Sequence, residues 1–182
     1  MRRGSRSAQA LVVLAVVAAV GLSACSPAKV GAAAIVGDSR ITSAQVNNAS
    51  AGIRQGNPQL AQGEGLERTV LYYLVIAPWV LPTAAANGQG VSNQEATKLL
   101  PDAKTPDPDS VLVLRTFIAL QKMQQAGLSE PLAQVQKDIA AANPKLSPRY
   151  GTFDAKSMSI VDAPPNWVVP QSEPTETTTE QP

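Results

Sequence analysis

A segment near the N-terminus determines which part of this chain is available to fold. Three arginines among the first six residues precede an apolar run over residues 10–20. Two small residues, Ser23 and Ala24, then stand directly before Cys25, the only cysteine of the chain. A basic end, a short apolar core and small residues at a cleavage point are typical of a secretory signal. Residues 1–24 are therefore expected to be removed and to take no part in the fold.

The cysteine at the cut makes this segment similar to the signal of bacterial lipoproteins, whose box is matched by Leu22-Ser23-Ala24-Cys25. In that family a diacylglycerol is attached to the cysteine thiol, and cleavage leaves the lipidated cysteine at the new N-terminus. The resemblance implies signal cleavage between Ala24 and Cys25, lipidation of Cys25, and attachment at the extracytoplasmic face of the cell membrane. Two or three acyl chains on one residue are enough for stable anchoring, since each buried CH₂ contributes about 0.8 kcal/mol.

Two other interpretations of this segment are weaker. An uncleaved transmembrane helix needs about 20 apolar residues, and the run here is shorter and is interrupted by Gly21 and Ser23. A lone cysteine is usually a small buried core residue, but Cys25 stands beside the apolar run and ahead of a Ser-Pro-Ala-Lys stretch typical of a tether. Residues 25–31 are therefore expected to be the lipidated cysteine and a short spacer.

The composition of the remaining chain excludes several classes of site. The signal takes three of the 15 Lys and Arg with it, which leaves 12 against 14 Asp and Glu. This slightly acidic balance argues against nucleic acid as a partner. The sequence contains no histidine, the commonest general base and metal ligand, and lipidation of Cys25 would leave no thiol nucleophile. We therefore expect no catalytic residue, no metal and no cofactor.

An enzyme remains an alternative with little support. Ser26 and Lys29 have the S-x-x-K spacing of some acyl-transfer enzymes. They lie next to the expected anchor, and the companion motifs of those enzymes are missing. The aspartates of the loop 101–109 do not follow the spacing of a calcium-binding loop. A solvated loop whose aspartates cap a helix explains them better.

Residues 32–163 have the pattern of one mainly helical domain. Gly37 and Asp38 mark a turn between two short strands, and Thr42 or Ser43 can cap the helix that follows. The last 19 residues, 164–182, are rich in Pro, Thr and Glu and are expected to be a disordered tail. The expected helices cover residues 43–54, 63–87, 92–100, 110–126 and 129–142, and a turn and a terminal strand are expected within 147–161.

The strongest helical pattern lies in residues 63–87. Its centre, residues 70–81, is apolar all round, but it is too short to span a membrane and contains Pro78. We predict a central core helix that is kinked near this proline. Its expected buried face consists of residues at spacings of three to four, namely Leu66, Val70, Tyr73, Ala77 and Leu81.

Three stretches together resemble one family of chaperones. Residues 33–42, with the Gly37-Asp38 turn and a closing Ile-Thr pair, are similar to the opening of SurA/PrsA/trigger-factor-like domains. Residues 71–96 resemble the second and third helices of that family. Residues 148–154 resemble the C-terminal return segment of actinobacterial SurA-like lipoproteins, which leads into a strand that pairs with the N-terminal strand.

The resemblance implies a SurA-N-like helical domain over residues 32–163, with a small two-stranded sheet that pairs its N- and C-terminal segments. In SurA and PrsA, such helices flank a parvulin prolyl isomerase domain. Here the chain leaves no room for that domain and supplies no histidine for its active site. Isomerase activity is therefore not expected, whereas the peptide-holding part of the family's function is.

The resemblance implies a lipid-anchored holdase that binds unfolded or extended segments of exported proteins. Such binding needs a groove lined by adaptable apolar and aromatic side chains. The alternative is a dedicated structural or assembly partner of one cell-envelope protein. The candidate peptide-binding residues are Tyr72, Trp79, Phe117 and Met123. For each of them taken singly, ordinary core packing is the favoured alternative.

Overall fold

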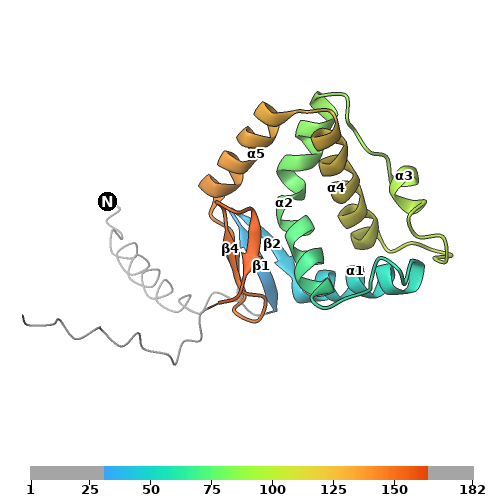
Figure 1. Ribbon diagram of the computed structural model, residues 1–182. Helices are drawn as coiled ribbons and strands as arrows, with labels where there is room; N and C mark the ends of the chain where they lie inside the picture. The colour runs from blue at the N-terminus through green and yellow to red at the C-terminus, as the bar shows by residue number, and fades with distance from the viewer. Residues whose placement is uncertain (1–30, 164–182) are drawn as a thin grey trace, which may run out of the picture. The chain divides into compact units, whose positions relative to one another are not determined.

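A computed structural model describes residues 31–163 (Figure 1). The predicted signal peptide, the predicted lipidation site at Cys25, most of the predicted tether and the C-terminal segment 164–182 lie outside the described residues. The mainly helical prediction is confirmed, with small antiparallel sheets beside the helices. The elements are β1 (Ala32–Val36), β2 (Ser39–Thr42), α1 (Ser43–Gly56), α2 (Leu66–Ala86), α3 (Asn93–Thr97), α4 (Pro108–Gln125), α5 (Ser129–Ala142), β3 (Lys145–Leu146), β4 (Thr152–Asp154) and β5 (Ser159–Val161).

Local capping explains where the helices begin. The Thr42 side chain accepts a hydrogen bond from the Gln45 backbone N–H at 3.1 Å, and the Gln45 side chain accepts one from the Thr42 N–H at 2.9 Å. This reciprocal capping box satisfies two of the donors left free at a helix start. Ser92 caps α3 by accepting from the Glu95 N–H. Asp107 caps α4, as expected for an aspartate of that loop.

Helix α2 is the centre of the fold. It packs against α1, α4, α5 and β1, and Figure 1 shows it between α4 and α5. Val70 and Ala77 of the predicted face are buried, but Leu66, Tyr73 and Leu81 are only partly buried. That part of the prediction was wrong, because a helix that is apolar all round has no single stripe for spacing to select. The neighbouring elements select the buried side chains instead.

By length and composition, α2 is also the helix within residues 31–163 that could cross a membrane. The sequence argument considered only residues 70–81, whereas the helix has 21 residues and so extends for about 31 Å. In the structure 44% of its apolar stretch is buried inside the fold. Val75 and Val80 have no exposed surface. Core packing therefore accounts for the buried part of the apolar surface of α2.

An N-terminal and a C-terminal segment pair in the sheet as predicted, but the C-terminal strand is a different one and the sheet has three strands. β1 is the central strand of a three-stranded sheet in the order β2-β1-β3, with Ala34 opposite Leu146. The expected partner of β1 was a strand after the return segment, but β5 pairs with β4 instead, with Phe153 opposite Ile160. A tight turn explains the difference, because the Tyr150 N–H donates to the Ser147 carbonyl at 2.9 Å. The chain thereby leaves β1 and closes a separate hairpin.

Helices α1 and α4 approach closely at one glycine. A Cβ atom added to Gly52 would lie 2.1 Å from the Ser110 Oγ. That hydroxyl donates a hydrogen bond to the Ala49 carbonyl at 3.1 Å. The absence of a side chain at Gly52 therefore allows α4 to bond directly to the backbone of α1.

Candidate functional site

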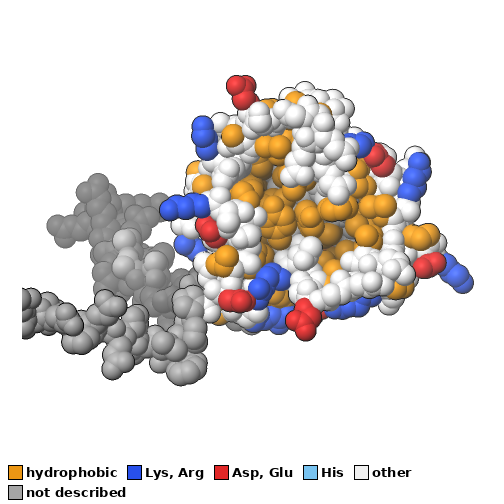
Figure 2. Space-filling model, in the orientation of Figure 1, with side chains coloured by type: hydrophobic (Ala, Val, Ile, Leu, Met, Phe, Trp, Pro, Cys, Tyr) orange, Lys and Arg blue, Asp and Glu red, His pale blue; other side chains and the backbone are white. Residues whose placement is uncertain are grey.

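Apolar side chains gather on the face of the molecule where α2 lies between α4 and α5. Figure 2 shows them as a nearly continuous area in the middle of this face, with charged side chains around its margin. Three hollows that share lining residues lie along α2. We refer to these hollows together as the α2 trough, because residues of α2 line all three.

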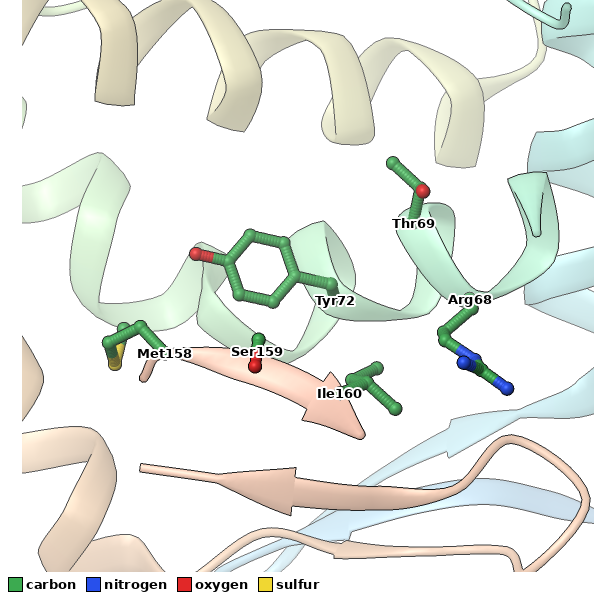
Figure 3. Close-up of a pocket in the computed structure, with 6 residues that line it drawn as sticks. All are labelled: Arg68, Thr69, Tyr72, Met158, Ser159 and Ile160. Carbon is green, nitrogen blue, oxygen red and sulfur yellow. The ribbon is translucent and has the colours of Figure 1, made fainter. Parts of the chain in front are cut away.

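The first hollow lies between α2 and β5 and has a volume of about 290 Å³. Figure 3 shows the ring of Tyr72 lying over β5, with Met158 near its hydroxyl end and Arg68 at the opposite end of the hollow. Met158 has a positive φ of 49°, a conformation uncommon for a residue with a side chain. The hairpin turn thereby brings a flexible thioether beside an aromatic ring.

The other two hollows continue the trough along α2. The second, of about 310 Å³, lies between α2, α4 and α5, and it shares Tyr72 and Met158 with the first. Its far wall includes Leu132 of α5. The third, of about 120 Å³, lies between α1, α2 and α4, and it shares Thr69 with the first. Tyr73 and Phe117 line this third hollow.

Two adjacent tyrosines of α2 line different hollows of the trough. Successive residues of an α-helix point about 100° apart, so Tyr72 lines the first and second hollows while Tyr73 lines the third. The two rings meet edge to face, with centroids 5.1 Å apart. Tyr73 meets Phe117 in the same manner at 5.7 Å. A cluster of three aromatic rings is therefore part of the surface of the trough.

Burial raises the pKa of the Tyr72 and Tyr73 hydroxyls above the usual value of 10.0. For Tyr72, the neighbouring Tyr73 hydroxyl adds to the rise. Both phenols are therefore neutral at ordinary pH. Each adds a hydroxyl group, able to donate and to accept a hydrogen bond, to a surface of mixed apolar and polar side chains.

An ion pair lies at the rim of the first hollow. The Arg68 Nη2 is 2.6 Å from the Asp162 Oδ1, and both side chains are exposed, at 42% and 85%. Such an exposed pair contributes less than about 1 kcal/mol to stability. Its importance is positional, because it connects α2 to the residue that follows β5.

The four candidate residues have different positions. Tyr72 and Phe117 line the trough. Trp79 is partly buried against the core and lines none of the three hollows of the trough. Met123 has no exposed surface, so its assignment to a binding surface was wrong. Its helical position faces the core between the surrounding elements, and no surface ligand can reach it in this conformation.

Sequence reasoning missed two residues of the trough. Tyr73 was assigned to the buried face of α2, and Met158 was regarded as part of a strand. The clustering of three aromatic residues at positions 72, 73 and 79 was a usable signal for Tyr73. No comparable signal existed for Met158, because its place in the trough depends on how the β4–β5 hairpin packs on α2.

A polar hollow of about 400 Å³ lies away from the trough, between α1 and the loop before α4. Gln55, Asp102, Lys104 and Asp107 line it. Nearby, burial and the Asp107 charge raise the pKa of Asp109, and a hydrogen bond with Gln45 opposes the rise. No group of three or more acidic, histidine or cysteine side chains within residues 31–163 is arranged to hold a metal ion.

Comparisons with known proteins find no match: no protein-family model matches the chain, and neither does any curated protein or solved structure. The resemblance to SurA-like domains therefore depends on the sequence stretches described above.

Proposed function

We propose that this protein is a lipid-anchored holdase, which binds unfolded or extended segments of exported proteins outside the cytoplasmic membrane. The observation that carries the proposal is the α2 trough. Its aromatic rings offer large apolar contact areas, and Met158 is an unbranched side chain that adapts to irregular partners. A surface of this kind suits ligands that share apolar character and not one fixed shape.

The dimensions of the trough favour a polypeptide over a small molecule. Pockets for small molecules usually enclose about 300–1,000 Å³. The first two hollows have volumes near the lower end of that range, and the third is smaller. The trough follows α2 from Leu66 to Val80, a distance of about 21 Å at 1.5 Å per residue. An extended chain covers that distance in about six residues.

The proposed anchor places the trough where exported proteins emerge. Lipidation at Cys25 would hold the domain at the membrane surface through a tether that ends before β1 at Ala32. Clients then meet the trough before they fold or aggregate. No isomerase step is part of the proposal, so binding and release would be the whole activity.

Photo-crosslinking in cells tests the proposal. A photoreactive residue replaces Tyr72 or Phe117, and the adducts are identified by mass spectrometry. Many different exported proteins at both positions would support a general holdase. One recurrent folded protein would instead favour a dedicated assembly partner. A probe at the exposed Val161, outside the trough, is the control, and equal labelling there would overturn the proposal.

A second test uses the purified protein and an aggregation-prone client. We expect the mature chain to slow client aggregation at a stoichiometric ratio, and Tyr72→Ser to weaken this effect several-fold. Val161→Ser is the matched control, since Val161 is an exposed apolar residue that lines none of the three hollows. Absence of any effect on several clients would overturn the holdase proposal.

A further inference from the structure

The described chain ends at the edge of the trough. β5 supplies Ser159 and Ile160 to the wall of the first hollow. The ion pair between Asp162 and Arg68, at 2.6 Å, holds the next part of the chain against the same rim. Ala163, the last described residue, therefore follows directly after a side chain that is paired at the rim of this hollow.

The sequence of that segment contains one apolar cluster. Trp167, Val168 and Val169 are its only large apolar side chains, and the remainder consists mainly of Pro, Thr, Glu, Gln and Ser. A tryptophan followed by two valines loses contact with water most readily by packing on another apolar surface. The trough is such a surface, and its first hollow is the one closest to the start of the segment.

The linker is long enough for this contact. Trp167 is four residues beyond Ala163, and four residues span at most about 14 Å. Because the cluster is tethered, its effective concentration at the trough is in the millimolar range. Even weak binding would then fill the hollow.

We propose that the Trp167-Val168-Val169 cluster docks in the first hollow of the α2 trough, against Tyr72 and Met158, as a tethered competitor of clients. The docking is argued only from the apolar surfaces of the cluster and the hollow, and does not depend on any client. Its regulatory consequence rests on the proposed holdase function, because clients would have to displace the cluster. The cluster would then occupy the first hollow when no client is present.

Tryptophan fluorescence tests the docking without any client. The chain has two tryptophans, so Trp79→Phe in the mature chain leaves Trp167 as the sole reporter. We expect blue-shifted emission and at least threefold protection from acrylamide quenching, compared with a synthetic peptide of residues 163–171. Emission and quenching equal to those of the free peptide would overturn the inference.

Variants of the trough define the docking site. Tyr72→Ser should shift Trp167 emission toward that of the free peptide. Leu60→Ser, in the third hollow, is the matched control and should leave the emission unchanged. Circular dichroism establishes that each variant is folded.

A peptide experiment measures the same contact if a variant is unfolded. In it, the 163–171 peptide binds to a chain whose own cluster is replaced by serine, through Trp167→Ser, Val168→Ser and Val169→Ser. If the protection of Trp167 from acrylamide increases with protein concentration, the cluster docks on a second copy of the chain. That result would overturn the proposal of docking within one chain.

Client binding separates this inference from the proposed function. The triple serine variant should bind an extended apolar client peptide several-fold more tightly than the unaltered chain. Protection of Trp167 with no client binding by either chain would support the docking and overturn the holdase function. Equal client binding by both chains, with Trp167 unprotected, would support the holdase function and overturn the docking.

Discussion

The ring of Tyr73 on α2 meets the ring of Phe117 on α4 edge to face, with centroids 5.7 Å apart and planes inclined at 79°. This contact joins the two helices on the side where the trough is open. Side chains that line the trough therefore also hold α2 and α4 together. Changes at the trough therefore affect both stability and binding, and the two effects must be measured separately.

Removal of the Phe117 ring should weaken the packing of α4 on α2. Phe117→Ala is expected to lower the free energy of unfolding by about 2 kcal/mol, since the ring is only partly buried and takes part in one aromatic pair. Tyr73→Phe keeps the ring pair and should cost much less. Urea denaturation measures both variants. Equal midpoints for Phe117→Ala and the unaltered chain would contradict the packing role.

The close approach of α1 and α4 predicts a strong effect of one methyl group. Gly52→Ala places a Cβ 2.1 Å from the Ser110 Oγ, and overpacking of this kind costs about 1–3 kcal/mol. Ser110→Ala removes the clashing oxygen along with its hydrogen bond to Ala49. The double variant should therefore be more stable than the sum of the two single losses predicts. Thermal unfolding of all four chains tests this, and strict additivity would exclude the clash.

The two trough tyrosines predict a loss of stability at alkaline pH. Burial raises their pKa above 10.0 in the folded state, so the folded state keeps the protons longer than the unfolded state does. Their contribution is complete below the unfolded pKa of about 10 and is lost as pH rises through the folded pKa. The unfolding temperature should fall between about pH 9 and pH 11. Replacement of both tyrosines by phenylalanine should reduce this fall, and an unchanged fall would assign it to other groups.

Met123 and Tyr72 should respond to substitution in opposite ways. Met123 is completely buried, so Met123→Ala is expected to cost about 2–5 kcal/mol of stability. It should leave the client affinity of the folded fraction nearly unchanged. Tyr72→Ser should weaken client binding with a smaller loss of stability. Unfolding and peptide titration of both variants test this difference, and a loss of affinity in folded Met123→Ala would return that residue to the binding surface.

The helices could be predicted from the sequence because their determinants are local. Thr42, Ser92 and Asp107 are capping residues within three positions of the backbone donors that they satisfy. The predicted range of α5 agrees with the structure at both ends. Capping and helical periodicity depend on neighbours within one or two turns, so the sequence contains them directly.

The trough was only half predictable from the sequence. An apolar helix with adjacent aromatics indicated a binding surface, and Tyr72 and Phe117 lie on it. Trp79 and Met123 also had apolar surroundings in the sequence, yet Trp79 is partly buried against the core outside the three hollows and Met123 lies inside the core. Apolar composition shows that a side chain leaves water but does not show which neighbour covers it.

By itself the sequence determined a mainly helical domain, the starts of its helices and the apolar character of α2. Tertiary structure alone decided which face of α2 stays open, that β1 pairs with β3, and that Met158 stands beside Tyr72. These features depend on contacts between residues far apart along the chain, such as Ala34 with Leu146. Local patterns carry no information on such contacts, because only the packing of the whole chain brings their partners together.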